Sequence, residues 1–293
     1  MQITIDEIYR EYRGLLISVA YRMTGSMAEA EDIVQDLFVR LAETDLSGIR
    51  EMRAYLIRSV THRALNVMNS SRHRREVYPG QWLPEPVADR PEDDPERRAV
   101  LSDDMSYALL VLLERLSPDE RAAFLLRDVF GMSYREVAQA MDKTEANSRK
   151  LVSRANMKLQ GERPKRTLDR ERSEAWLRMF TRATESGRFG ELLAFVRDDA
   201  VMVSDGGGKV RAAIHPIVSA ARIAAFFEGI AAKGSLAGEW RLIHLGGEPG
   251  LALLRDGAIV KVLLPDWDDE GRIRQLFLIV NPDKLKHLGL PDH

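Results

Sequence analysis

Five prolines within residues 76–103 constrain the fold of this chain more than any other feature of its sequence. They stand at positions 79, 84, 86, 91 and 95, in the string YPGQWLPEPVADRPEDDPE. Because proline fixes φ and lacks a backbone N–H, no helix can run through this stretch, and an extended chain is favoured. We therefore expect residues 76–103 to be a stiff, acidic linker that does not hold the parts on either side of it in one fixed arrangement.

Residues 1–75, before the linker, carry the pattern of helices. TIDE (Thr4–Glu7) and SMAE (Ser26–Glu29) have the spacing of helix-capping boxes. Apolar residues follow at helical intervals, first from Ile33 to Leu41 and again in a long helix expected over Arg53–Ser70. The outer face of that long helix is polar and is followed by a basic run, which suits phosphates and unstacked bases as well as plain solvent. The DNA-binding candidates here are Arg58, His62, Asn66, Asn69, Arg72, Arg74 and Arg75.

Residues 104–163, after the linker, predict a second helical domain that ends in a helix-turn-helix. One helix is expected to begin at Ser133, and Thr144 caps a second helix whose apolar residues extend to Leu159. A recognition helix places its N-terminal residues at base edges in the major groove, although a helical hairpin with a solvated outer face would give the same pattern. The DNA-binding candidates on its outer face are Asn147, Arg149, Lys150, Ser153 and Arg154.

Residues 169–293 combine helical and strand-like patterns and predict an α+β domain. Helices are expected at Glu174–Glu185 and Ala220–Ala232, followed by the strand-like runs EWRLIHLG, GLALLRDG, AIVKVLLPDW and RIRQLFLIV. Glycine pairs and Asp-Gly steps between these runs supply turn chemistry. Helices followed by consecutive strands are typical of the α+β class.

Composition excludes several classes of function. The chain has no cysteine, which rules out a disulfide scaffold, thiolate zinc sites and a cysteine nucleophile. The N-terminal MQITIDEIYR is no signal peptide, and no apolar run reaches the ~20 residues of a membrane span, so a cytoplasmic protein with no membrane contact is expected. The net charge of −2 hides two acid-free basic runs, Arg58–Arg75 and Arg149–Lys158, and local patches are what attract phosphates.

The order of these parts resembles the extracytoplasmic-function sigma factors of bacterial RNA polymerase. AEDIVQDLFVRL (Ala30–Leu41), the basic helix, the linker, SPDERAAFLLRDVFGMSYREVAQAM and the second basic helix carry the resemblance, over roughly residues 1–162. It implies that residues 1–75 read the −10 promoter element, that residues 104–163 read the −35 element, and that the partners are promoter DNA and the clamp and flap regions of core RNA polymerase. By the same resemblance the acidic face Asp32, Gln35 and Asp36 docks on the clamp. The recognition helix lacks the GTVKSR pattern usual in sigma factors, so the −35 sequence does not carry over.

The remainder resembles the SnoaL-like branch of the NTF2-like cone fold. WLPEP (82–86), DGGGK (205–209) and NPDKL (281–285) are similar to signatures of sigma factors with a fused SnoaL-like extension. In that group the extension acts as a built-in regulator, which implies control in cis with no separate anti-sigma factor. The glycines would let another surface approach closely, and the two C-terminal strings are expected at two rims of one sheet, facing the linker or the sigma domains. The proline-flanked Trp82 of WLPEP is expected to dock against them. The candidate interdomain regulatory residues are Trp82, Pro84, Asp205, Gly206, Gly207, Gly208, Lys209, Asn281, Pro282, Asp283 and Lys284.

Two alternatives stay open on the sequence: a one-component regulator that senses a ligand, and a ketosteroid-isomerase-like enzyme. A small ligand in the C-terminal domain fits either of them, whereas we expect no catalytic residue, cofactor or metal site. The acidic DIVQD helix argues against a simple repressor, which has no use for it. The residues expected to line a C-terminal pocket are Trp176, Met202, His215, Phe226, Trp240 and His244.

Overall fold

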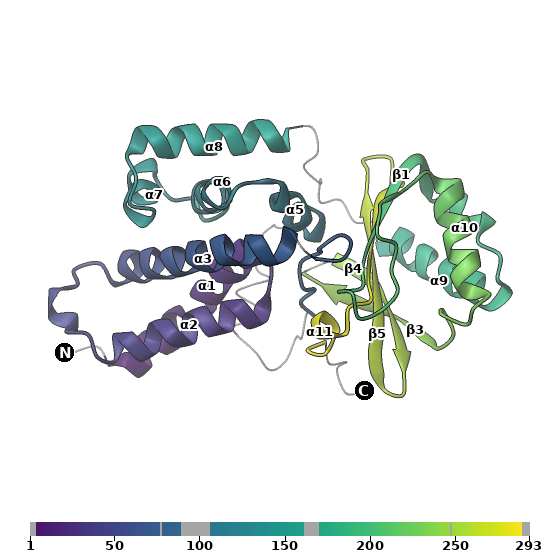
Figure 1. The fold of residues 1–293 in the computed structure, drawn as a ribbon, viewed down its shortest axis with the longest axis horizontal. Helices are drawn as coiled ribbons and strands as arrows, with labels where there is room; N and C mark the ends of the chain where they lie inside the picture. The colour runs from purple at the N-terminus through teal and green to yellow at the C-terminus, as the bar shows by residue number, and fades with distance from the viewer. Residues whose placement is uncertain (1–3, 77, 89–105, 161–169, 247, 289–293) are drawn as a thin grey trace. The chain divides into compact units, whose positions relative to one another are not determined.

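The computed structural model describes residues 4–76, 78–88, 106–160, 170–246 and 248–288 (Figure 1). Side chains of residues 71–76 and 170 lie outside this description. Contacts divide the chain into two compact units. The helical unit comprises residues 1–76, 90–105 and 109–163, and the C-terminal unit comprises residues 77–89, 106–108 and 164–293.

Several helices of the helical unit begin at well-formed N-terminal caps. Thr4, Ser117 and Ser133 each form a complete capping box with the glutamate three residues later, and Ser26 accepts the Glu29 N–H. These local bonds satisfy N–H groups that a helix start leaves unpaired. The α-helices are α1 (Ile5–Thr24), α2 (Met27–Leu41), α3 (Met52–Glu76), α5 (Tyr107–Leu112), α6 (Pro118–Phe124), α7 (Tyr134–Ala140) and α8 (Glu145–Leu159). Short 3-10 turns lie at Leu46–Gly48 and Leu113–Arg115, and a π-helical turn at Leu125–Val129.

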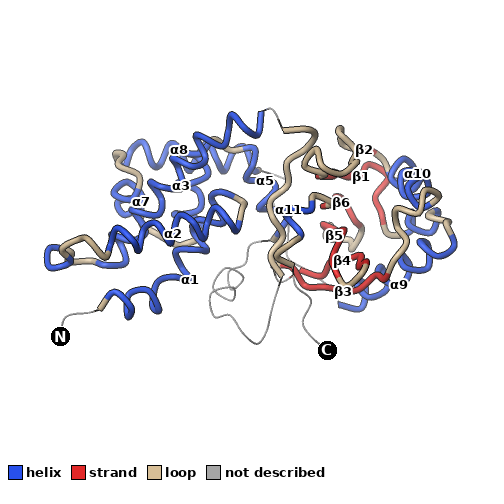
Figure 2. The backbone as a smooth tube through the Cα atoms, turned by 60° about the horizontal axis from the view of Figure 1, so that its bottom comes forward, coloured by secondary structure: helices blue, strands red, loops and turns tan. Residues whose placement is uncertain are grey.

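The C-terminal unit is a mixed sheet with its two longest helices packed on one face (Figure 2). The strands are β1 (Val196–Asp205), β2 (Ile217–Val218), β3 (Glu239–Leu245), β4 (Glu248–Arg255), β5 (Ala258–Trp267) and β6 (Ile273–Ile279), in the spatial order β2-β1-β6-β5-β4-β3. The helical elements are α9 (Arg170–Ser186), the 3-10 turn η4 (Gly190–Ala194), α10 (Ala220–Ala231) and α11 (Pro282–Leu285).

The pairing of β1 with β6 is parallel, whereas every other neighbouring pair is antiparallel. Asp205 pairs with Ile279 in that ladder, so DGGGK after β1 and NPDKL after β6 leave the sheet at the same edge. Two different rims were expected from the sequence. A run of antiparallel strands would separate the two strings. The parallel pair instead brings the carboxyl ends of β1 and β6 together.

A core rich in aromatic residues fills the space between the sheet and helices α9 and α10. Trp176, Phe180, Phe189 and Phe227 are almost fully buried there, and Phe180 contacts the other three rings in tilted or edge-to-face geometry. Such ring pairs add stability beyond their buried area. Among the described residues, no helix is long and apolar enough to cross a membrane.

Candidate promoter interface and linker-binding cluster

Helix α8 presents the expected row of polar side chains on its exposed face. Leu151, Val152, Ala155 and Leu159 are buried and hold the helix against the unit, and Thr144 caps it by accepting the Asn147 N–H at 3.2 Å. The exposed residues include all five candidates, Asn147, Arg149, Lys150, Ser153 and Arg154.

The five candidates on α8 differ in their contacts with other side chains of the protein. Arg149 lies over the Tyr134 ring, 4.1 Å from its centroid, and its guanidinium is 3.7 Å from the Glu145 carboxylate. Lys150 and Arg154 form no ion pair with any residue in the described ranges. Of the three cationic candidates on α8, these two are therefore more available to DNA than Arg149.

Helix α3 buries one side and exposes the other, as its periodicity predicts. Leu56, Ile57, Val60, Ala64 and Met68 are buried. The candidates Arg58, Asn66 and Asn69 are exposed and His62 is half-buried, whereas the side chains of Arg72, Arg74 and Arg75 lie outside the described residues.

Helix α3 and the helix-turn-helix are packed together, which the linker was expected to prevent. Asp142, in the turn of the helix-turn-helix, accepts a hydrogen bond from Arg58 Nη2 at 2.5 Å and lies 3.1 Å from His62 Nε2. Buried Arg121 donates from Nε to the carbonyl of buried Arg22 at 2.9 Å, joining α6 to α1. Sequence reasoning missed this packing because no local pattern reports which outer faces meet.

The acidic face of α2 is exposed. Asp32, Gln35 and Asp36 point outward, while Ile33 and Val34 are buried. Asp36 is 3.2 Å from Arg63 on α3, and its side chain remains 70% exposed. The surface is therefore open to a basic partner.

Asp205 organises what we call the linker-binding cluster, made of Tyr78, Trp82, Leu83, Asp205, Asn281 and Lys284. Its carboxylate is fully buried and accepts hydrogen bonds from the Tyr78 hydroxyl at 2.6 Å, the Leu83 N–H at 2.9 Å and the Gly207 N–H at 3.0 Å. Lys284 donates to it at 2.6 Å. A buried carboxylate is tolerated only when it is paired in this way.

Lys284 also binds the linker directly, through Trp82 and Leu83. Its ammonium, on a side chain that is 10% exposed, donates to the Leu83 carbonyl and lies 4.0 Å from the centroid of the Trp82 ring. Asn281 donates to the Tyr78 hydroxyl at 2.9 Å and caps α11 by accepting the Asp283 N–H. Burial and the hydrogen bond to Asp205 raise the pKa of the Tyr78 phenol well above its usual range.

The glycines of DGGGK permit close approach. A Cβ at Gly207 would collide with the Asn281 side chain, and one at Gly208 would lie 2.9 Å from Pro79 Cγ. Both glycines also have positive φ, at 62° and 69°. Lys209, beyond them, forms an exposed ion pair of 2.6 Å with Asp283.

The rest of the described linker also lies on this unit. Buried Pro84 accepts a hydrogen bond through its carbonyl from the Tyr107 hydroxyl at 2.7 Å, and the Tyr107 ring contacts Phe277 at 5.5 Å. Val87 accepts the Gly246 N–H at 3.1 Å, and Ala88 forms a bridge with Leu245. Residues 78–88 are thus bound to the C-terminal unit along their whole length. Tyr78 and Tyr107 were missed because the sequence gives a lone tyrosine no distinguishing signal.

The residues expected to line a C-terminal pocket do not form one group. Trp176, Met202 and Trp240 belong to the buried core, and Phe226 packs partly against it. His215 and His244 are exposed and do not lie with the buried members of this set. β3 alternates between the two faces of the sheet, and the sequence did not say which face was covered.

Comparisons with known proteins agree with this architecture. The profile "Sigma-70 region 2" matches residues 8–75, and "Sigma-70, region 4" matches residues 106–159. The ECF RNA polymerase sigma factor SigJ of Mycobacterium tuberculosis (strain H37Rv) is 32% identical over 97% of this chain and 93% of its own length. The crystal structure of Mycobacterium tuberculosis SigJ superposes with a TM-score of 0.78, covering 96% of this chain and 98% of that one. The probable sigma factor SigI of the same organism is 30% identical over 64% of this chain and 66% of its own.

Two helical domains with these matches define a sigma-70-type transcription initiation factor. The chain belongs to the extracytoplasmic-function RNA polymerase sigma factors. The expected fold class is confirmed: helical sigma domains precede a mixed-sheet domain of the NTF2-like, SnoaL-like kind. Sigma factors bind core RNA polymerase and promoter DNA, so the one-component regulator and the enzyme are not favoured.

Proposed function

We propose that this sigma factor is regulated in cis by its C-terminal domain, which acts by holding the linker between the two promoter-reading domains. The observation that carries the proposal is the buried Asp205 carboxylate, which binds Tyr78, the Leu83 backbone and Lys284 together. The proposal includes the boundaries stated above, with region 2 in residues 1–75, region 4 in 104–163 and the regulator in 169–293.

Holding the linker restricts how far the promoter-reading domains can separate. A chain extends by at most ~3.3–3.6 Å per residue. Immobilising the 11 residues 78–88 therefore removes up to ~36–40 Å from the distance that the linker can span between the two domains. Region 2 and region 4 must occupy separate elements of one promoter, so release of the linker favours the DNA-bound arrangement. We propose that this control needs no catalytic step and no separate anti-sigma factor.

The packing of α3 against the helix-turn-helix supports a closed resting form. Arg58, a candidate for reading the −10 element, donates to Asp142 from Nη2, and the candidate His62 lies 3.1 Å from the same carboxylate. While this contact holds, Asp142 competes with a phosphate for the Arg58 guanidinium and places a negative charge beside both candidates. We therefore propose that promoter binding requires α3 and α7 to separate, and that core polymerase drives the separation by binding region 2.

The roles of individual residues are proposed by position. The exposed acidic face of α2 (Asp32, Gln35, Asp36) suits the basic surface of a partner, here the polymerase clamp. Lys150 and Ser153 suit base edges of the −35 element, and Arg154 suits phosphate. The contact between the linker and the C-terminal unit involves Trp82 and Pro84 on the linker. On the C-terminal unit it is formed or flanked by the glycines at 206–208 and by Asn281 through Lys284.

Transcription from a promoter library with purified core polymerase tests the proposal. Full-length protein is compared with a chain that ends at residue 168 and with Tyr78→Phe and Asp205→Asn variants, while core binding is measured in parallel. We expect the truncated chain and both variants to change promoter output and still bind core polymerase. The matched control is Tyr134→Phe, which alters a tyrosine outside the cluster. Promoter output equal to wild type in all three would refute regulation through the linker.

A further inference from the structure

Three N–H donors in the C-terminal unit are buried without an acceptor among the described residues. They are Arg172 Nε, Trp176 Nε1 and Trp267 Nε1. Trp176 is 2% exposed and Trp267 is 8% exposed. Trp240 in the same core donates to the Leu236 carbonyl at 3.1 Å, so indole pairing is achievable in this core. Buried unpaired donors are rare and costly, and a group of them calls for a missing acceptor.

The three donors belong to one region of the unit. Arg172 and Trp176 are four residues apart on α9 and therefore share a face. The rings of Trp176 and Trp267 meet edge to face, 6.4 Å between centroids. A Cβ at Gly271 would lie 2.8 Å from Arg172 Nε, so the guanidinium lies against the turn that follows Trp267. We call this region the α9–hairpin site.

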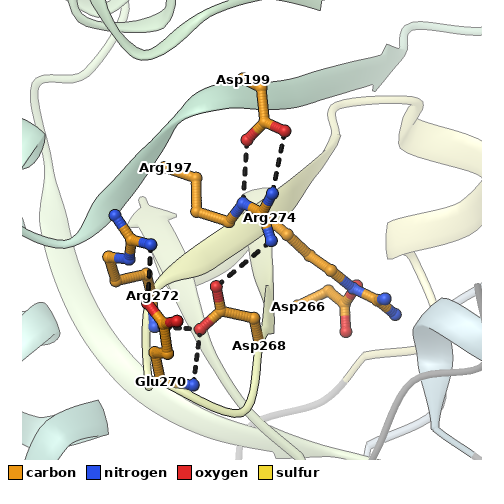
Figure 3. A network of polar contacts seen from close by, with 7 residues as sticks. All are labelled: Arg197, Asp199, Asp266, Asp268, Glu270, Arg272 and Arg274. Atoms are coloured by element: carbon orange, nitrogen blue, oxygen red, sulfur yellow. Dashed lines mark hydrogen bonds and ion pairs between the residues drawn. The ribbon is translucent and has the colours of Figure 1, made fainter.

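The turn between β5 and β6 is held in place by its own polar network (Figure 3). Asp268 accepts the N–H groups of Glu270 at 3.0 Å and Arg272 at 2.8 Å, and the Arg197 guanidinium joins it to Asp199. Glu270 pairs with Arg272, and Asp266 pairs with Arg274 at 2.5 Å. Each carboxylate in this network pairs with another arginine, so none of them supplies the acceptor that Arg172 lacks.

The chemistry of the donors selects the class of ligand. An indole N–H and a guanidinium can only donate, so the ligand must present acceptor oxygens. The positive charge of Arg172 favours an anion. Phe180 and Phe195 also contact Trp176, at 5.5 and 6.1 Å between centroids, and such aromatic walls favour an apolar body. We propose that the α9–hairpin site binds a small carboxylate with an aromatic or apolar body, whose carboxylate oxygens accept from Arg172, Trp176 and Trp267.

This site lies at the opposite end of the sheet from the linker-binding cluster. Trp267 and Val196 both pair with Ile273, at the start of β1 and β6, whereas Asp205 pairs with Ile279 at their other ends. Six residues along β6 separate the two ends, or roughly 20 Å. Ligand binding is therefore distinct from linker binding, and it is measured without any transcription assay, so it can fail while cis regulation stands.

Indole resonances of the full-length protein test the proposal directly. The indole N–H signals of Trp82, Trp176, Trp240 and Trp267 are followed by ¹⁵N nuclear magnetic resonance and assigned with single Trp→Phe variants. Sodium benzoate is titrated beside three matched probes: acetate without the ring, benzyl alcohol without the charge, and inorganic phosphate. We expect benzoate to move the Trp176 and Trp267 signals saturably and to leave Trp240 unmoved. The three probes are expected to move Trp176 and Trp267 far less.

Variants separate direct donation from general packing. Trp176→Phe, Trp267→Phe and Arg172→Gln each remove one donor and are expected to weaken benzoate ~5- to 10-fold, the effect of one hydrogen bond. Trp240→Phe, which removes an indole N–H that is already paired, should bind benzoate as wild type does. Arg172→Gln changes a side chain that is only partly buried, so it remains informative if a tryptophan variant fails to fold. Signals that stay unmoved by benzoate, or that move equally with benzyl alcohol, would overturn the proposal and leave water as the occupant.

Discussion

Removing the charge of Asp205 should release much of the energy that binds the linker. In Asp205→Asn the amide oxygen can still accept from the Leu83 N–H, but the Lys284 ammonium loses its ion pair with Asp205 while its side chain is only 10% exposed. Breaking a buried pair from one side costs ~3–5 kcal/mol, because the other charge stays buried. Lys284→Met should cost about 1.5–3 kcal/mol, since Asp205 keeps three neutral donors.

The double variant Asp205→Asn with Lys284→Met distinguishes pairing from packing. With both charges gone, the loss of unfolding free energy should be clearly smaller than the two single losses added together, because the double variant leaves no unpaired charge. Urea unfolding of the C-terminal unit, followed by tryptophan fluorescence, measures all three. Asp283→Asn is the control, because its ion pair with Lys209 is more than half exposed and worth under ~1 kcal/mol. Strict additivity in the double variant would refute the reasoning.

Four further predictions follow from the sites. Lys150→Ala should change −35 preference at one base position by ~1–3 kcal/mol, and uniform weakening across a promoter library would contradict the placement of α8. Asp142→Ala should free Arg58 and raise affinity for a −10 DNA fragment, whereas unchanged affinity would refute the closed form. Since the pKa of Tyr78 is raised, its stabilising effect is full below the ordinary tyrosine value of ~10 and is lost as pH rises toward the folded pKa; absorbance titration against Tyr78→Phe should show one phenol that ionises late. Asp32→Arg with Asp36→Arg should abolish core polymerase binding and leave the circular dichroism of the helices intact, and wild-type affinity would exclude the acidic face.

Local signals were strong enough to predict the elements from sequence. The capping box at Thr4, the helix start at Ser133 and the cap at Thr144 form as their spacing predicts. Each depends on atoms at most three residues apart, so the information lies within one turn of helix. The β3–β6 strands were also found, since alternation and glycine turns mark them locally.

The strings WLPEP, DGGGK and NPDKL were recognisable from sequence and were expected to meet, but the pairs of residues that meet were not predicted. Asp205 meets Lys284 across 79 residues of chain and Tyr78 across 127. Their meeting depends on the parallel pairing of β1 with β6, which no local pattern specifies. The role of Tyr78 was therefore invisible, although the aromatic residue stands beside Pro79 in the linker.

The sequence alone thus determined the helices, the strands, the order of the domains and the outward faces of α2, α3 and α8, because each follows from periodicity and capping within a few residues. Only the tertiary structure decided that Asp142 meets Arg58, that Asp205 binds Tyr78 and the Leu83 backbone of the linker, and that buried N–H donors of Arg172, Trp176 and Trp267 lack acceptors among the described residues. The physical reason is that burial and the partners of polar groups depend on which surfaces meet. Those surfaces are brought together by strand order and helix packing between residues far apart in the chain.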